Sequence, residues 1–293
     1  MKLLVYGALN IDLIYSVDHI VVPGETLDAG ALEKSAGGKG ANQAAAAAKA
    51  GADVCLAGRI GGDGAFLLSM LEPCGVDTGF VATGPGSTGQ ALIQLDRNGQ
   101  NAIVYYAGEN GEITAAQAEA VISKFGEGDI ISLQNELPHT AEMMKAAHKK
   151  RIKIVYNPSP WNVQIRNFPL ELVDIFIVNE IEGPALAGLP PQTVPEKVLD
   201  CLTGQFPGKE IILTAGKDGA YYGCGNVREK GNALSLPVED TTGAGDTFTG
   251  YYLAARMKNH SVSDALNYAC RAASIAVSRK GALQSIPWAK EVF

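Results

Sequence analysis

Short apolar runs alternate with longer amphipathic runs along most of the chain. The short runs have the length of strands buried on both faces, and the longer ones carry apolar residues at helical spacing. The predicted strands cover residues 3–9, 54–60, 129–133, 152–156, 174–178, 211–215 and 220–223. The predicted helices cover residues 41–50, 114–124, 140–150, 194–206, 245–258 and 263–278. This alternation favours βαβ units, and therefore an α/β fold with a mostly parallel sheet covered by helices on both faces.

Two regions, at about residues 12–35 and 88–107, contain β-like runs without helices between them. In the second region, Asn98-Gly99 lies between two such runs, and this dipeptide is a strong signal for a β-hairpin. We expect the two regions to form a small β appendage that serves as a lid or a dimer surface. The appendage would belong to a single domain spanning residues 1–293.

Composition excludes several classes of protein. Hydrophobic residues make up 46% of the chain and charged residues 19%, as in globular proteins with a large core. No apolar run reaches the roughly 20 residues of a membrane span, and the net charge of −7 gives no footprint for nucleic acid. The five cysteines form no C-x-x-C pair and the four histidines show no metal-like spacing, which favours a cytoplasmic protein without a zinc site or disulfide scaffold.

The 34 glycines are clustered, and one cluster opens the predicted helix that begins at residue 245. The backbone amides of Gly243, Ala244 and Gly245 would face outward there and favour an anion. Asp246 would repel a static phosphate at this place. It could instead accept a proton from a hydroxyl while the amides hold the negative charge that develops on a transferring group. The alternative is a core helix that Asp246 merely caps.

A second glycine cluster, Gly37-Gly38-Lys39-Gly40, precedes an alanine-rich helix. It is not a Walker loop, because Lys39 is followed by glycine and the four-residue spacer is absent. Glycines allow close approach of a polyol, and the Asn42 amide can both donate to and accept from hydroxyls. A flexible turn with a solvated lysine explains this segment equally well.

Two further segments follow predicted strands, where ligands of open α/β sheets bind. Asn179 and Glu182 could hold a magnesium ion through its waters, although a simple capping turn is the alternative. Residues 214–219 form a glycine turn that suits a nucleotide contact or a bare hairpin. Residues 84–89 match the dinucleotide motif G-x-G-x-x-G, but we reject that function because a strand-like run follows instead of a helix.

Two long motifs resemble the two signatures of the PfkB/ribokinase family of carbohydrate kinases. The first is Gly37-Gly38-Lys39-Gly40-Ala41-Asn42-Gln43-Ala44, with Gly51 and Gly61 at the expected spacing. The second is Asp240-Thr241-Thr242-Gly243-Ala244-Gly245-Asp246-Thr247-Phe248-Thr249-Gly250. The resemblance covers essentially the whole chain. It implies a ribokinase-like three-layer α/β sandwich with a β-sheet lid.

The resemblance also implies a role for each matching residue. Asp246 would be the catalytic base and would contact the sugar, which would be held by Asn10, Asp12, Gly38, Lys39, Gly40, Asn42 and Glu136. The ATP site would comprise Asn179, Thr214, Gly216, Lys217, Gly219, Gly245 and Cys270. Glu182 would hold Mg²⁺ through water. A potassium ion beside the anion hole would be bound by Asp240, Thr242, Ala276, Arg279, Gly281 and Ser285.

The activity implied by the resemblance is phosphoryl transfer from ATP to the primary hydroxyl of a pentose, with O5 of D-ribose as the expected acceptor. Family members also imply a homodimer. Two alternatives stay open: a kinase of the same family for a nucleoside, fructose, deoxyribose or a sugar acid, and a sugar sensor that has lost catalysis. Three positions depart from the family pattern: Tyr251 in the second signature, Phe66 after the Gly61 turn, and Cys270 at the expected adenine contact.

Overall fold

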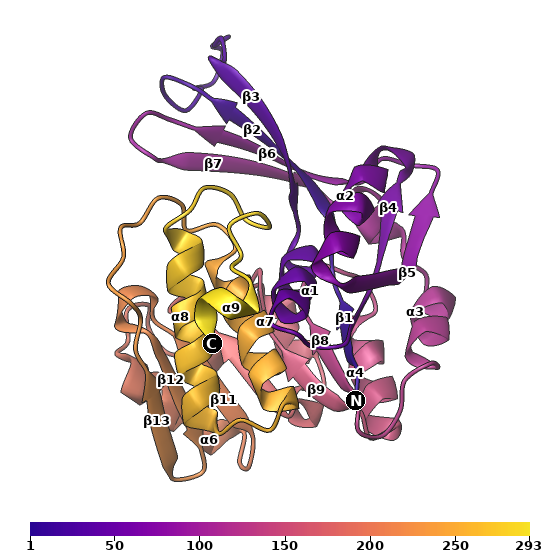
Figure 1. Ribbon diagram of the computed structural model, residues 1–293, viewed down its shortest axis with the longest axis vertical. Coiled ribbons are helices and arrows are strands. Elements are labelled where there is room, and N and C mark those ends of the chain that lie inside the picture. Colours follow the sequence, from indigo (N-terminus) through magenta and orange to yellow (C-terminus); the bar gives the residue numbers. More distant parts are fainter.

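The computed structural model describes residues 1–293 and contains a large sheet with helices on both faces and a smaller sheet above one edge (Figure 1). The large sheet has nine strands in the order β13-β12-β11-β10-β9-β8-β1-β4-β5, and only the β11–β12 and β12–β13 pairs are antiparallel. Its strands are β1 (Leu3–Tyr6), β4 (Val54–Gly61), β5 (Val76–Gly84), β8 (Ile130–Leu133), β9 (Lys153–Tyr156), β10 (Ile175–Val178), β11 (Glu210–Thr214), β12 (Ala220–Cys224) and β13 (Val227–Gly231).

Alternate side chains of the central strands point into two separate cores. In β1, Leu3 and Val5 join one core, whereas Leu4 and Tyr6 join the other. The first core is covered by α1 (Lys39–Lys49), α2 (Ala65–Leu71), α7 (Ala244–Met257) and α8 (Val262–Val277). The second is covered by α3 (Ala115–Ile122), α4 (Thr140–Lys149), α5 (Glu182–Ala187) and α6 (Pro195–Gln205), while the short α9 (Ala289–Val292) ends the chain. None of these helices combines the length and apolar character needed to cross a bilayer.

This arrangement confirms the predicted α/β fold, and every predicted strand and helix has a counterpart. The predicted boundaries lie within two residues of the observed ones except at β1, which ends at Tyr6 and not at residue 9, because the chain turns there into the small sheet. The sequence pattern also missed α2, α5, α9, β5 and β13. These elements are short, or, in β5 and β13, partly exposed with an irregular alternation of apolar residues.

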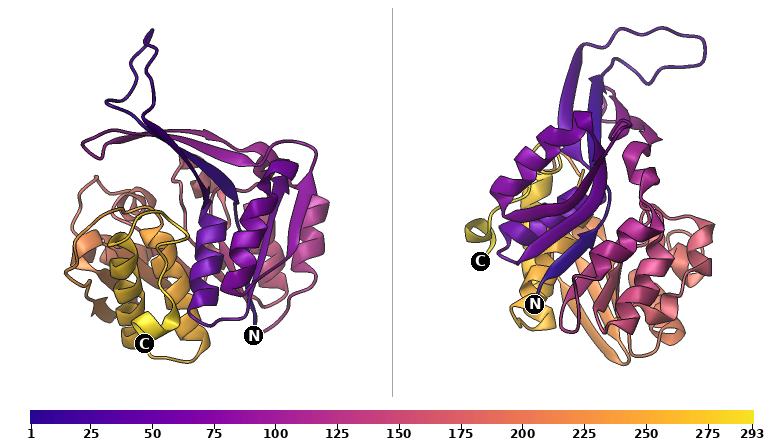
Figure 2. Two further views of the ribbon diagram at one scale, coloured as in Figure 1. Left: turned by 45° about the horizontal axis from the view of Figure 1, so that its top comes forward. Right: turned by 90° about the vertical axis from the view of Figure 1, so that its right-hand side faces the viewer.

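The small sheet forms the lid. It contains β2 (Asn10–Ser16), β3 (Ala31–Gly37), β6 (Gly89–Leu95) and β7 (Asn101–Tyr106) in the order β3-β2-β6-β7. The hairpin predicted at Asn98-Gly99 joins β6 and β7, and the Asp96 carboxylate accepts hydrogen bonds from the Asn98 and Gln100 amides within it. Figure 2 shows the lid and the long connection between β2 and β3 projecting away from the body of the molecule. The division of the chain into one domain with this lid stays a prediction.

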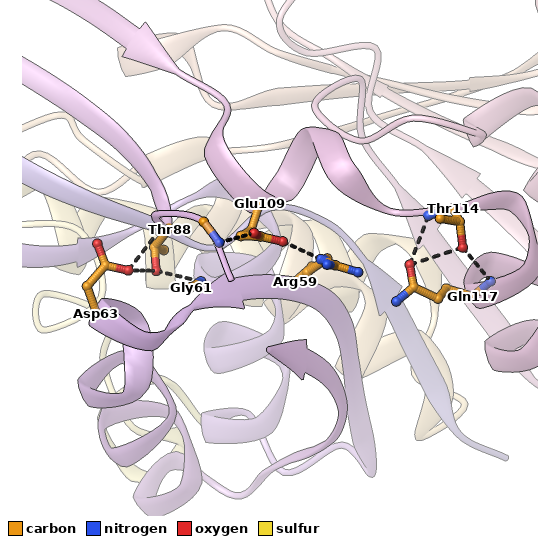
Figure 3. A network of polar contacts seen from close by, with 8 residues as sticks. Arg59, Gly61, Asp63, Thr88, Glu109, Thr114 and Gln117 are labelled. Atoms are coloured by element: carbon orange, nitrogen blue, oxygen red, sulfur yellow. Dashed lines mark hydrogen bonds and ion pairs between the residues drawn. The ribbon is translucent and has the colours of Figure 1, made fainter. Parts of the chain in front are cut away.

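A polar network fixes the base of the lid (Figure 3). The Glu109 carboxylate is buried and pairs with the guanidinium of Arg59 on β4. Thr88 donates its hydroxyl and amide to Asp63, and its oxygen accepts from the Gly61 amide at 2.9 Å. A Cβ on Gly84 would overlap the Glu109 carboxylate. The glycines of the rejected dinucleotide motif therefore allow close packing at this base, and β6 follows them directly.

Candidate active site

The predicted site residues emerge from the carboxyl ends of neighbouring parallel strands. Asn10 follows β1, Glu136 follows β8, Asn179 follows β10, and Thr214 ends β11. Because these strands are adjacent or nearly adjacent in the sheet, their ends open on one common edge. The N-termini of α1 and α7 reach the same edge.

Close packing of α1 against α7 creates the centre of the site. A Cβ on Gly250 would lie 2.5 Å from the Ala46 side chain and 2.6 Å from the Ala47 amide nitrogen, so only glycine allows this approach. As a result, two amide side chains of α1 reach the first turn of α7. Asn42 Nδ2 donates to Asp246 Oδ2 at 3.1 Å, and Gln43 Nε2 donates to Asp246 Oδ1 at 3.0 Å.

Asp246 is 7% exposed, and burial raises the pKa of its carboxyl group above the ordinary value. The Lys39 ammonium and the two amide donors act in the opposite direction and favour the carboxylate. Burial alone would lower the pKa of Lys39, but the negative charges of Asp246, Glu136 and Glu182 raise it. The site therefore contains the Lys39 ammonium surrounded by three carboxyl groups. The ammonium favours the ionised form of the carboxyl groups, and their negative charges favour the protonated form of the lysine.

The amides at the start of α7 are arranged for an anion. Gly243 has a φ of 74°, which places it in the left-handed region that favours glycine, and it directly precedes the first helical residue. The Ala244 amide donates to the Thr241 carbonyl at 3.3 Å, whereas the Gly243 and Gly245 amides have no backbone partner. Unpaired amides at a helix N-terminus bind negative charge.

Three predicted sugar residues lie where the lid joins the large sheet: Asn10 and Asp12 begin β2, and Glu136 follows β8. Asn10 and Asp12 are 4% and 8% exposed, and burial raises the pKa of the Asp12 carboxyl group to about 7. Burial also raises the pKa of Glu136 to about 7. The positive charge of Lys39 lowers this pKa, whereas the negative charges of Asp246 and Asp12 raise it. Glu136 accepts a hydrogen bond from the Lys39 amide at 3.1 Å. The Asn42 Oδ1 atom is buried without a partner, as expected of an acceptor that receives a substrate hydroxyl.

Two cavities meet at the N-terminus of α7. The larger has a volume of about 860 Å³ and is lined by all seven residues predicted to bind ATP. The smaller has about 200 Å³ and is lined by Lys39, Asp246, Glu182 and the 243–245 loop. Asn179, Thr214, Thr241, Ala244 and Gly245 line both cavities, so a ligand in the larger one can extend toward Asp246.

The smaller cavity offers donors that suit a hydrated magnesium ion. Glu182 is buried, and burial raises the pKa of its carboxyl group despite the hydrogen bonds it receives. Its Oε2 accepts from the Asn179 amide at 3.2 Å and from Asn157 Nδ2 at 3.3 Å. A carboxylate held this way beside two amide side chains fits an ion that retains most of its water ligands.

The two loops predicted to hold potassium lie against each other. Asp240 Oδ1 accepts from the Thr242 amide and Oδ2 accepts from the Gly281 amide, each at 2.9 Å. Burial alone would raise the pKa of Asp240, but these hydrogen bonds and the Lys280 charge lower it. The buried Ser285 donates to the Ala282 carbonyl at 2.8 Å, and the Ala276 carbonyl accepts from the Arg279 amide at 3.0 Å. The structure thus brings the predicted residues together next to Gly243.

Sequence reasoning missed three residues of this site. Gln43 belongs to the first family motif without a predicted role of its own, although its side-chain amide donates to Asp246. Asn157 and Ser159 line the smaller cavity directly after β9. The rule that singled out Asn179, a polar side chain at the carboxyl end of a strand, would have found both. The position of Gln43 in the first signature, as a polar residue before a run of alanines, is the signal that could have found it.

The three departures from the family pattern are accommodated in different ways. Tyr251 is fully buried and donates its hydroxyl to the Pro287 carbonyl at 2.7 Å, which ties α7 to the C-terminal segment. Phe66 lies on α2 with the Lys34 ammonium 4.3 Å from its ring centre. Cys270 lines the larger cavity, and burial raises the pKa of its thiol to about 12, so it offers an uncharged side chain there.

The chain was compared with known families and structures. It matches the family described as pfkB family carbohydrate kinase over residues 1–289. It is 32% identical to a ribokinase of Staphylococcus aureus, over 99% of this chain and 98% of that protein. It is 34% identical to a ribokinase of Haemophilus influenzae, over 99% and 96% respectively.

Solved structures agree with these relatives. The ribokinase of Cryptococcus neoformans in complex with ADP is similar with a TM-score of 0.88 and 36% identity, over 99% of this chain and 98% of that one. The ribokinase of Arabidopsis thaliana complexed with ribose and ATP gives a TM-score of 0.89 and 31% identity, over 99% and 97%. The likeness confirms the expected sandwich with its lid sheet. The chain therefore belongs to the pfkB family of carbohydrate kinases and is an enzyme of the ribokinase type.

Proposed function

We propose that this kinase transfers the γ-phosphoryl group of ATP to the O5 hydroxyl of D-ribose and forms ribose 5-phosphate. The observation that carries the proposal is the position of Asp246. Its buried carboxylate lies at the N-terminus of α7 and lines the smaller cavity, which adjoins the nucleotide-sized one. Lys39, one of the predicted sugar residues, lines the same smaller cavity. A hydroxyl that reaches Asp246 would lie directly beside amides able to hold a phosphoryl group.

In the proposed mechanism, the hydroxyl oxygen of the sugar attacks the γ-phosphorus, and Asp246 accepts the proton that this hydroxyl loses. The Gly243 and Gly245 amides, which have no backbone partner, stabilise the negative charge on the phosphoryl oxygens, and the bond to ADP breaks on the opposite side. The Ala244 amide, which was predicted to join them, donates to the Thr241 carbonyl instead. Lys39 adds a positive charge at the same place. Positioning and electrostatic stabilisation provide most of the rate enhancement of such transfers.

We infer roles for two metal ions. Glu182, with Asn179 nearby, would hold Mg²⁺ through water, and the ion would neutralise charge on the ATP phosphates. Potassium would be held by the carboxylate of Asp240, by Ser285 and by carbonyls of Thr242, Ala276, Arg279 and Gly281. Since Asp240 links the two loops beside Gly243, an ion there would fix the direction of the amides that face the phosphoryl group.

The choice of sugar rests on the relatives. Those at 31–34% identity in Staphylococcus aureus, Haemophilus influenzae and Arabidopsis thaliana are ribokinases, and the Arabidopsis enzyme is complexed with ribose and ATP. A deoxyribokinase of Salmonella typhi is 30% identical over 98% of this chain, which makes 2-deoxyribose the second candidate. The expected homodimer and cytoplasmic location remain part of this proposal.

The first prediction concerns the substrate. ATP consumption should be measured with D-ribose, 2-deoxy-D-ribose, fructose, fructose 6-phosphate and adenosine at equal concentrations. We expect D-ribose to give the highest kcat/KM, because the amide and carboxyl groups of Asn10, Asp12 and Glu136 can pair with several hydroxyls at once. A preference for another acceptor would contradict the proposed substrate. Binding of ribose without turnover of any acceptor would instead indicate a sugar sensor.

The second prediction concerns the base. Asp246→Asn should lower kcat at least ~10²-fold, the usual scale for loss of a positioned general base. The KM for the sugar should change far less, because asparagine can still accept a hydrogen bond. Asp264, an exposed carboxylate in the first turn of α8, provides the matched control, and Asp264→Asn should retain wild-type kcat. An Asp246→Asn enzyme with more than half of the wild-type kcat would contradict the assignment.

The third prediction concerns potassium. Replacing K⁺ with tetramethylammonium at constant ionic strength should reduce kcat several-fold and leave the KM values for sugar and ATP nearly unchanged, because the ion itself would touch neither substrate. Asp240→Asn should weaken the response to added K⁺. Rates that stay constant after thorough removal of potassium and related ions would show that hydrogen bonds alone hold the loops.

A further inference from the structure

One lid residue outside the predicted sugar set faces the same space as Asp12. In the lid sheet, Asp12 on β2 is paired with Ala91 on β6, and Ala91 is paired with Tyr105 on β7. Residues paired across neighbouring strands point to the same face of a sheet. Asp12 and Tyr105 therefore share one face, and only the methyl group of Ala91 separates them.

Tyr105 lies on the face of the lid sheet that carries the predicted sugar residues Asn10 and Asp12. Burial and the negative charge of Glu136 raise the pKa of Tyr105 to about 12, and the Asn110 side chain, which lies close to the hydroxyl, has the opposite effect. Asn110 is itself fully buried and donates to Asn10 Oδ1 at 2.8 Å. The hydroxyl is thus near Glu136, Asn110 and, through Asn110, Asn10, although 45% of the Tyr105 surface is exposed.

The sugar space has two ends. Asp246 lies at one end and the row of Asp12 and Tyr105 lies at the other. Glu136 links the two ends, because its carboxyl group accepts a hydrogen bond from the amide of Lys39, which lines the cavity of Asp246, and because the charge of Asp12 acts on it. A pentose whose O5 reaches Asp246 must turn the C1–C2 side of its ring toward the lid. The group that meets Tyr105 is therefore the anomeric end of the sugar.

We propose that Tyr105 is a specificity-determining residue that selects a free pentose over a sugar substituted at C1. Its hydroxyl donates to or accepts from a hydroxyl at the C1–C2 end, and its ring occupies the space that the base of a nucleoside would need. This inference rests on the proposed function and deepens it.

The test compares wild-type enzyme with Tyr105→Phe, Tyr105→Val and the control Tyr106→Phe. Tyr106 is the adjacent residue of β7 and points to the other face of the lid, with 58% of its surface exposed. We expect Tyr105→Phe to weaken D-ribose binding about tenfold, the equivalent of ~1.4 kcal/mol for one hydrogen bond, as measured by calorimetry without ATP. The effect should appear in KM and not in kcat.

Tyr105→Val should also raise the ratio of kcat/KM for adenosine to kcat/KM for D-ribose at least about tenfold. The reason is that the substitution removes the ring that would occupy the space of the nucleoside base. Tyr106→Phe should change neither quantity. Equal D-ribose Kd values for wild type and Tyr105→Phe, or an unchanged ratio in Tyr105→Val, would overturn the inference. A wild-type enzyme that binds D-ribose but does not phosphorylate it would contradict the proposed function alone. Absence of D-ribose binding to the wild type would contradict both.

Discussion

A carboxylate that is almost fully withdrawn from water determines the arrangement of this molecule. Asp246 can act as a base only when charged, yet burial favours its protonated form. Three groups offset this cost: Lys39 by its charge, and Asn42 and Gln43 by their amide hydrogen bonds. All three lie on α1. The first turn of α1 must therefore contact the first turn of α7.

That contact explains residues whose roles are otherwise obscure. Gly250 and the alanines of α1 allow the two helices to approach until the backbone of Gly250 packs against Ala46 and Ala47. Gly40 packs directly against Gly7, which places the start of α1 next to the end of β1 and the start of the lid. Gln43 is oriented by Ser132 and Gln134, which donate to its Oε1 and leave its Nε2 to face Asp246. The sheet edge, both helices and the lid thus converge on one charged group.

The sequence predicted the parts of this arrangement that repeat a local pattern. Buried strands appear as short apolar runs, and the 243–246 loop combines glycine, an acidic residue and a helix start. The missing parts depend on contacts between distant segments. The role of Gln43 becomes visible only when α7 packs beside it, and Tyr105 looks like a surface residue until strand pairing aligns it with Asp12. The lid-base pair of Arg59 and Glu109 joins residues 50 positions apart.

The most direct test of this account is the pH dependence of kcat for wild type and for Gln43→Met, which removes one amide donor from Asp246 and lines neither cavity. Activity needs the ionised form of Asp246, so it should fall as the pH drops through the raised pKa of this group. Lys39, Glu136 and Glu182 surround Asp246 in both enzymes. The account predicts that the acidic limb of the Gln43→Met profile lies at higher pH than that of the wild type. An acidic limb that stays in place or moves to lower pH would contradict it.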